Sequence, residues 1–388
     1  MYPLSTIAHM PRSPIRQIYE KAILMDDVVF FSLGEPDFDT PAQVVDEAVR
    51  SLRQGETRYT PNAGLFELRQ AISENLLAYD HVAYDPASEI SVTSGGMEAL
   101  VLALMTVIEP GDEVILPDPS YTNYRDQIQI CKGVPVYVPV LEEEGFQLNP
   151  AALRRAITDR TRVVMINTPA NPTGGVASRR LLEEIAGIAI ERDLCVLFDE
   201  VYKYLYYSDR PFCSIASLPG MRERTLVVDS CSKTFAMTGW RVGWVAGPSE
   251  IVGCIPKLQE NLCSCVPAFV QRGAVCALKT GAQDVQRMNA AYRARRDFIV
   301  EAINAIPGLS ARTPEGAFYL FVNIRQTGLT SEAFAMRLLE EAHVALSPGS
   351  AFGPSGEGYV RISYASSIDT LRKGVERIAA FMKKLRGE

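Results

Sequence analysis

Short apolar segments alternate with helical patterns along this chain from about residue 88 onward. Seven such segments contain β-branched or aromatic residues typical of strands: Glu89–Thr93, Glu113–Pro117, Val134–Val138, Val163–Ile166, Cys195–Phe198, Thr225–Val228 and Val242–Ala246. Apolar residues recur at helical spacing between them, most clearly over Gly96–Ile108 and Ser178–Arg192. Strands that are apolar on both faces and separated by helices predict an α/β fold, with a mainly parallel seven-stranded sheet covered by helices on both sides.

The end of the chain has a different pattern, in which strand-like segments at 317–323 and 359–363 are mixed with helical ones at 331–342 and 368–385. A chain of 388 residues is long enough for more than one domain. We expect a large domain over residues 31–285 and a smaller α+β domain over residues 286–388. Residues 1–30 are predicted to form an N-terminal arm that belongs to the smaller domain.

Composition narrows the range of functions. A net charge of −7 with dispersed Lys and Arg residues argues against a nucleic-acid partner. The longest apolar run, Leu100–Ile108, is too short to span a bilayer, and the N-terminus lacks the pattern of an export signal. Eight scattered cysteines are typical of reduced thiols, so we expect a cytoplasmic protein. The three histidines are far apart, and no metal site is expected.

Lys233 lies in the segment Asp229-Ser-Cys-Ser-Lys-Thr-Phe-Ala-Met-Thr-Gly-Trp-Arg241. An isolated lysine is usually solvent-exposed and has no special role. Here Ser230 and Arg241 add a hydroxyl and a guanidinium suited to a phosphate dianion, close to an amine that can form a Schiff base. This combination is typical of a lysine that holds pyridoxal phosphate (PLP).

The segment Ser94-Gly95-Gly96 follows a predicted strand and opens a predicted helix. The free N–H groups at such a helix end can bind a phosphate, although a glycine turn before a helix is more often only a turn. Tyr121 follows the next strand and is a candidate to lie over a cofactor ring. An ordinary loop tyrosine is an equally good interpretation of that residue alone.

Four more polar residues lie in or after predicted strands. Asn171 lies in a turn rich in proline and glycine, which orients its amide. Asp199 comes where a buried strand ends and therefore requires a partner, such as a protonated pyridine nitrogen. Tyr202 could bind the oxygen of the same ring. Arg361 ends a late strand and is suited to a carboxylate, although a surface arginine would be the more common interpretation.

Together these segments resemble the class I aminotransferases, the PLP-dependent family related to aspartate aminotransferase, over nearly the whole chain from about Ser13. The motifs that carry the resemblance are Gly34-Glu-Pro-Asp-Phe-Asp-Thr-Pro41, Arg58-Tyr-Thr-Pro-Asn-Ala-Gly-Leu65 with Glu67-Leu-Arg69, Asn171-Pro-Thr-Gly174, Asp199-Glu-Val-Tyr202, Ser230-x-Ser-Lys233 with Arg241, and Arg361. The resemblance implies a PLP-dependent transferase fold of type I and a ping-pong transfer of an amino group from an L-amino acid to a 2-oxo acid.

The resemblance also implies a role for each site residue. Lys233 would bind PLP covalently, Asp199 its ring nitrogen, Asn171 and Tyr202 its ring oxygen, and Tyr121 its face. The phosphate would lie among Ser94, Gly95, Gly96, Ser230 and Arg241. The substrate α-carboxylate would bind Arg361, Asn171 and the backbone of Gly34. Tyr59 would reach the phosphate of a neighbouring subunit, which implies a homodimer.

Two alternatives use the same residues or the same fold. A PLP-dependent carbon–sulfur β-lyase, or a related eliminating enzyme, would need the same lysine, aspartate and arginines. A non-catalytic PLP-binding regulator would need a DNA-binding module, for which a resemblance that starts near Ser13 leaves no room.

The substrate side chain is less well specified by the sequence. Aspartate-selective relatives with a similar glycine turn carry a lysine directly after the two glycines, where this chain has Met97. This apolar residue favours neutral or broad specificity, although Met97 could also simply pack beneath the cofactor. The segments Ser13–Arg16 and Glu315–Phe318 are expected to line the mouth of the substrate site.

Overall fold

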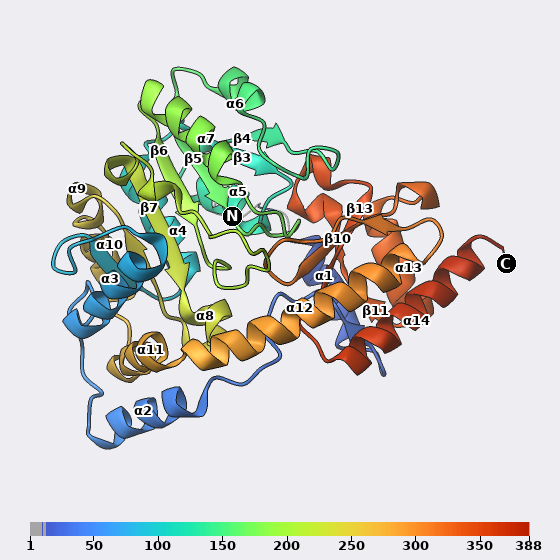
Figure 1. Cartoon of the computed structure of the whole chain (residues 1–388), viewed down its shortest axis with the longest axis horizontal. Coiled ribbons are helices and arrows are strands. Elements are labelled where there is room, and N and C mark those ends of the chain that lie inside the picture. The colour runs from blue at the N-terminus through green and yellow to red at the C-terminus, as the bar shows by residue number, and fades with distance from the viewer. Residues whose placement is uncertain (1–9, 11–12, 388) are drawn as a thin grey trace, which may run out of the picture.

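The computed structural model of the protein describes residue 10 and residues 13–387 (Figure 1). Part of the predicted N-terminal arm, residues 1–9, 11 and 12, lies outside this description, as does residue 388.

The predicted seven-stranded sheet is present, in the order β2-β8-β7-β6-β5-β3-β4. Its strands are β2 (Ile90–Thr93), β3 (Glu113–Asp118), β4 (Val134–Pro139), β5 (Thr161–Asn167), β6 (Cys195–Asp199), β7 (Thr225–Ser230) and β8 (Gly243–Ala246). Strands β4, β3, β5, β6 and β7 run parallel, and β8 runs antiparallel to both β7 and β2. The prediction of a mainly parallel sheet is therefore confirmed.

Helices cover both faces of this sheet, because neighbouring residues of each strand point to opposite sides. Leu116 packs in the apolar core beneath α4 (Gly96–Val107) and α5 (Thr122–Ile130), whereas Ile115 packs in the core on the other face, beneath α6 (Pro150–Ala156) and α7 (Arg179–Glu191). Both residues are fully buried. The carboxyl ends of β5, β6 and β7 consequently meet at one edge between two helical layers.

A second group of helices lies at the edge of the sheet near β2. In it α11 (Ala268–Thr280) packs against α2 (Ala42–Arg53) and α3 (Phe66–Asp80) (Figure 1). The long helix α12 (Ala282–Asn304) then runs toward the C-terminal part. The helices α8 (Cys231–Thr234), α9 (Ser249–Val252) and α10 (Ile255–Leu262) are shorter. Among the described residues, no helix is both long and apolar enough to cross a membrane.

The C-terminal part is built on a four-stranded antiparallel sheet of order β12-β13-β10-β9. Its strands are β9 (Ser310–Ala311), β10 (Tyr319–Asn323), β12 (Ser347–Pro348) and β13 (Tyr359–Ser363), and its helices are α13 (Ser331–Ala342) and α14 (Ile368–Leu385). Near the N-terminus, α1 (Pro14–Ala22) is followed by β1 (Val29–Phe30), which pairs in parallel with β11 (Val344–Ala345). The first and last parts of the chain therefore pack together.

Six short 3₁₀ helices complete the described elements: η2 (Ile215–Ser217), η3 (Arg222–Arg224), η4 (Thr238–Trp240), η5 (Arg325–Thr327), η6 (Gly349–Phe352) and η7 (Pro354–Gly356).

Candidate active site

A cavity of about 670 Å³ lies at the carboxyl ends of the central strands, next to the C-terminal part. Most of the site residues predicted from the sequence line it: Gly34, Gly96, Tyr121, Asn171, Asp199, Tyr202, Ser230, Lys233, Arg241 and Arg361. These residues are separated by up to a few hundred positions in the chain. The fold brings them together because ligands of parallel sheets bind beyond the carboxyl ends of the strands.

Lys233 projects from the short helix α8, directly after β7. Its Nζ donates a hydrogen bond of 2.6 Å to the backbone oxygen of Gly34. Burial lowers the pKa of the Lys233 amine to about 8, the charge of Glu35 opposes this shift, and Arg361 and Arg241 add to it. Lys233 is therefore an amine that loses its proton more easily than an exposed lysine, as the predicted chemistry requires.

Asp199 is the last residue of β6 and is only 6% exposed. Its Oδ2 accepts a hydrogen bond of 2.6 Å from the Tyr124 hydroxyl, and its Oδ1 accepts one of 3.1 Å from the Val201 N–H. Burial raises the pKa of Asp199 to about 6, against the lowering effect of these two donors and of Lys233. An additional cation in the cavity would favour the ionised form.

Arg361 is 4% exposed and lies on β13, so that the C-terminal part contributes it to the cavity. Its Nη1 donates to Asn171 Oδ1 at 2.9 Å. Its Nη2 donates to the backbone oxygen of Ser32 at 2.6 Å and to Ser347 Oγ at 3.2 Å. Its Nε is buried and has no partner among the described residues. A buried guanidinium with an unused donor is suited to an anionic ligand.

Arg241, which lines the cavity, contacts the glycine turn. The Nη2 of Arg241 donates to the backbone oxygen of Ser94 at 3.2 Å. Gly95 has a φ of +83°, and a Cβ on it would lie 2.5 Å from this same Nη2, so only glycine fits there. The Ser94 N–H is bound by Glu98 at 2.5 Å, which leaves the N–H groups of the first turn of α4, beginning at Gly96, as the donors of this helix end.

Three tyrosines, Tyr121, Tyr202 and Tyr319, also line the cavity. The hydroxyls of Tyr202 and Tyr319 lie 2.8 Å apart. Tyr121 donates to Met97 Sδ at 3.5 Å, so the methionine packs against the candidate ring-stacking residue. Phe318, which was expected at the substrate mouth, is instead fully buried in the core against Tyr202. That expectation was wrong because neighbouring residues around β10 point to opposite sides, and it is Tyr319 that lines the cavity.

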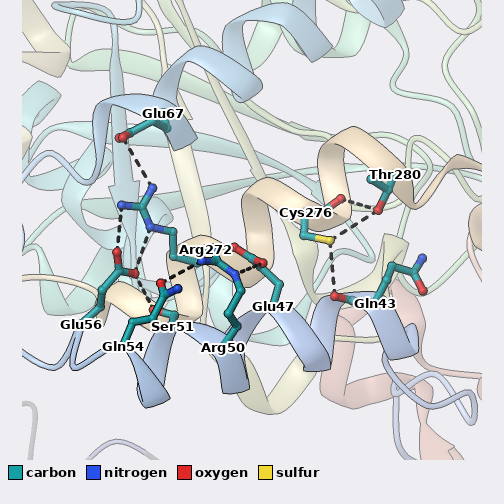
Figure 2. A network of polar contacts seen from close by, with 10 residues as sticks. All are labelled: Gln43, Glu47, Arg50, Ser51, Gln54, Glu56, Glu67, Arg272, Cys276 and Thr280. Atoms are coloured by element: carbon teal, nitrogen blue, oxygen red, sulfur yellow. Dashed lines mark hydrogen bonds and ion pairs between the residues drawn. The ribbon is translucent and has the colours of Figure 1, made fainter.

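Tyr59 lies outside the cavity of its own chain and is 89% exposed. Helix α11 fixes the loop that carries it. The buried side chain of Gln271 donates to Thr60 Oγ1 at 3.0 Å and accepts from the Leu65 N–H at 2.7 Å. Figure 2 shows that the next residue, Arg272, bridges Glu56 and Glu67 at the two ends of the same loop, with its Nε 3.1 Å from Glu56 Oε2 and its Nη1 3.5 Å from Glu67 Oε1.

Several residues at the cavity were not identified from the sequence. They are Tyr124 and Tyr319, described above, and Asn167. The side chain of Asn167 donates to the backbone oxygen of Asp199 at 3.0 Å and accepts from the Asn171 N–H at 2.8 Å. Tyr124 lies one helical turn after Tyr121, and this spacing was a usable signal. By contrast, the predicted mouth residues Ser13, Ile15 and Arg16 do line the cavity.

Comparison with known proteins identifies the family. The model of the family "Aminotransferase class I and II" matches residues 26–378. "Putative aminotransferase YugH" of Bacillus subtilis is 44% identical, with 96% of each chain covered. "Aspartate aminotransferase" of Pyrococcus abyssi is 43% identical, again with 96% of each chain covered. The crystal structure of an aromatic aminotransferase from Pyrococcus horikoshii matches with a TM-score of 0.91 and 44% identity, over 95% of this chain and 99% of the other. This chain therefore belongs to the class I and II aminotransferases and is a PLP-dependent transaminase.

Proposed function

We propose that Lys233 is the residue that binds PLP covalently, with Asp199 at the ring nitrogen and Asn171 and Tyr202 at the ring oxygen. Tyr121 covers the ring. Ser94, Gly95, Gly96, Ser230 and Arg241 surround the phosphate, and Arg361, Asn171 and Gly34 bind the α-carboxylate of the substrate. The observation that carries this proposal is the convergence of a buried amine, a buried carboxylate and a buried guanidinium with an unused donor in one cavity.

The chemistry of these groups fits PLP. A phosphate dianion requires cations and hydrogen-bond donors, which the Arg241 guanidinium, the Ser230 hydroxyl and the N–H groups at the start of α4 supply. A protonated ring nitrogen requires a buried carboxylate, which Asp199 supplies. The close approach of Arg241 to Gly95 would be blocked by any side chain at that glycine. The cavity therefore offers both a set of anion-binding groups and a buried carboxyl group.

The bound cofactor supplies an electron-accepting ring that stabilises negative charge at the Cα of the amino acid. Arg361 and Asn171 hold the α-carboxylate, so that the Cα proton lies within reach of Lys233. The Lys233 amine, with its pKa lowered by burial to about 8, removes this proton and later returns one. Asp199 keeps the ring nitrogen protonated, and Tyr124 and the Val201 N–H hold the Asp199 carboxylate in place.

The covalent attachment can be tested directly. Borohydride reduction of the holoenzyme, followed by peptide mapping, should find the cofactor on Lys233. Lys233→Ala should still bind PLP without a covalent link and should lose nearly all turnover, whereas Lys257→Ala on the surface of α10 is the matched control. Reduced cofactor on Lys203 or Lys257 would contradict the assignment.

We infer that the amino donor is an L-amino acid with a neutral side chain, or one of a broad range, and that the acceptor is a 2-oxo acid. Relatives are named for aspartate and for aromatic amino acids, so the family alone does not decide between them. Support for a neutral side chain comes from Met97 and from the apolar residues Ile15, Leu33 and Phe352, which line the same cavity.

We also propose that the enzyme is a homodimer, in which Tyr59 reaches the phosphate of the partner subunit. The 89% exposure of this tyrosine on a well-anchored loop supports the proposal.

A cytoplasmic location is supported by eight free cysteines. The division into residues 1–30, 31–285 and 286–388 is supported by the pairing of β1 with β11, while α12 continues across the boundary at 285.

A further inference from the structure

A second group of charged side chains lies behind the cavity and has no part in the proposed reaction. The Nζ of Lys203 lies 2.6 Å from Asp80 Oδ2, 3.3 Å from Glu200 Oε2 and 3.3 Å from Asp229 Oδ2. None of these four side chains is more than 1% exposed. We call Lys203, Asp80, Glu200 and Asp229 the Lys203 cluster.

Three members of the Lys203 cluster are chain neighbours of residues that line the cavity. The pairs are Asp199 with Glu200, Tyr202 with Lys203, and Ser230 with Asp229. At the ends of β6 and β7 this arrangement follows from the strand itself, because successive side chains point to opposite sides. A displacement on the cluster side is therefore passed to the cavity side through a single peptide unit.

The cluster joins three parts of the fold. Glu200 continues the pairing of β6 with β7, since its N–H donates to the Val228 oxygen at 2.9 Å. Asp229 Oδ1 accepts the Ser230 N–H at 2.6 Å, and its Oδ2 remains for Lys203. Asp80 is the last residue of α3 and links the same ammonium to the helical layer. Lys203 thus connects the ends of two strands that carry cofactor-site residues.

Three carboxylates surround one ammonium group, and, although burial opposes it, they raise the pKa of Lys203 well above its ordinary value. Burial raises the pKa of Glu200 to about 8 and that of Asp229 to about 7. One oxygen each of Asp80 and Glu200 is buried without a hydrogen-bond partner among the described residues. Apolar residues of similar volume would often stabilise a fold as well as such a network, but they would not fix the strand ends relative to one another.

We propose that Lys203 is a positioning residue for the cofactor site, which holds the ends of β6 and β7 so that Asp199, Tyr202 and Ser230 keep their places in the cavity. This inference rests on the proposed roles of those three residues. Two aromatic rings support the placement of the ammonium group, because Nζ lies 5.7 Å from the centroid of Tyr79 and 5.6 Å from that of Tyr204.

Two isosteric variants separate positioning from general stabilisation. Asp229→Asn removes an acceptor of Lys203 on the cofactor side and keeps the oxygen that accepts the Ser230 N–H. Asp80→Asn removes an acceptor on the α3 side and serves as the matched control. Two quantities are measured on each holoenzyme: the rate of PLP release and the pH at which the visible absorbance of bound cofactor changes. The thermal unfolding midpoint is measured on each PLP-free protein.

We expect Asp229→Asn to release PLP at least about tenfold faster than the wild type, because it breaks a buried ion pair with Lys203. It should also shift the pH of the absorbance change. Asp80→Asn should lower the unfolding midpoint and leave the release rate within about twofold. If Asp229→Asn does not fold, Glu200→Gln tests the link to β6 with the same expectation.

Equal effects of the two variants on PLP release would overturn the inference, as would an Asp229→Asn protein that changes only in its unfolding midpoint. Borohydride mapping of the wild type is done first. Cofactor found away from Lys233 would reject the proposed function itself, whereas cofactor on Lys233 together with equal effects of the variants rejects only the positioning role.

Discussion

The Asp199 carboxylate combines deep burial with two donors that hold it in place. In the proposed mechanism its negative charge keeps the ring nitrogen protonated. Asp199→Asn is nearly isosteric and removes this charge, so PLP should remain bound while kcat falls about 10³-fold, on the order of 4 kcal/mol of transition-state stabilisation. Steady-state kinetics with saturating PLP measure the effect.

Tyr124→Phe is the matched control for that variant, because it removes the 2.6 Å hydrogen bond and leaves the Asp199 charge. A neutral partner lost from a charged group costs about 1.5–3 kcal/mol, so kcat should fall by roughly one to two orders of magnitude. If Asp199→Asn retained near-normal turnover, the carboxylate would be structural and the argument about the ring nitrogen would be wrong.

The Lys233 amine gives a pH dependence of known sign. Its pKa in the folded protein is lowered by burial from 10.5 to about 8. The PLP-free protein should therefore take up PLP faster as the pH rises, with an inflection near pH 8. Between pH 8 and pH 10.5 the unfolded chain holds more protons at this lysine than the folded one, so the contribution of Lys233 to stability increases with pH over that window.

Absorbance stopped-flow over a pH series measures the inflection. Glu35→Gln supplies the control, because the charge of Glu35 raises the pKa of Lys233, and its removal should move the inflection to lower pH. An inflection at the ordinary value for lysine, or no response to Glu35→Gln, would contradict the assignment of the reactive amine.

Residues at the ends of strands could be predicted from the sequence, whereas their partners could not. Lys233, Asp199 and Asn171 follow apolar strands, and that local pattern is enough to bring them to one edge of a parallel sheet. Tyr319 reaches the site because alternate residues of a strand face the same side, and Ser32 contributes a backbone oxygen to Arg361. Neither contact can be recognised from the type of residue in the sequence. The cluster around Lys203 likewise depends on Asp80 and Asp229, which are distant from Lys203 in sequence, although Glu200 is only three residues away.

At the scale of elements, the Tyr59 loop depends on helix α11. Arg272 contacts Glu56 and Glu67, whereas Arg50, in the same network in Figure 2, contacts Glu47 of α2 and Gln54 directly after that helix. Arg272→Met should loosen the loop and weaken PLP binding about fivefold, on the order of 1 kcal/mol for a half-exposed ion pair, without lowering kcat at saturating PLP.

Fluorescence titration of the PLP-free protein measures this affinity, and Arg50→Met is the control that should leave it unchanged. Equal weakening in both variants would mean that the network stabilises α2 in general. If Arg272→Met lowered kcat but left the affinity for PLP unchanged, the loop would not contribute to phosphate binding. This result would argue against the proposed role of Tyr59.

Long elements were predictable and short ones were not. The seven strands of the large sheet and the helices α13 and α14 carry enough apolar residues for a period to be visible. The two-residue strands β1 and β11 have no period, and they exist only because Val29 and Val344 meet in the folded chain. The reversed direction of β8 also could not be predicted, because an apolar strand has the same pattern in either direction.

For the whole molecule, the substrate cavity requires both parts of the chain. Arg361 and Phe352 come from the C-terminal part, Ile15 and Arg16 from α1, and Met97 from the helix next to the central sheet. Specificity is therefore a property of how these parts meet. Among the described residues that line the cavity, Arg16 is the cation without a proposed cofactor or α-carboxylate role, and its side chain is 68% exposed and paired with Glu20 at 3.3 Å.

This arrangement predicts the choice of amino donor. A second carboxylate next to Met97 would lose its water without gaining a buried cation, which costs several kcal/mol, whereas an apolar side chain gains about 25 cal/mol per Å² of buried surface. Phenylalanine and methionine should therefore have a higher kcat/KM than aspartate, by about tenfold or more. Met97→Lys should raise kcat/KM for aspartate, and Met97→Leu, which adds no charge, should not. If aspartate is preferred by the wild type and Arg16→Gln abolishes that preference, then Arg16 supplies the cation and the interpretation of Met97 is wrong.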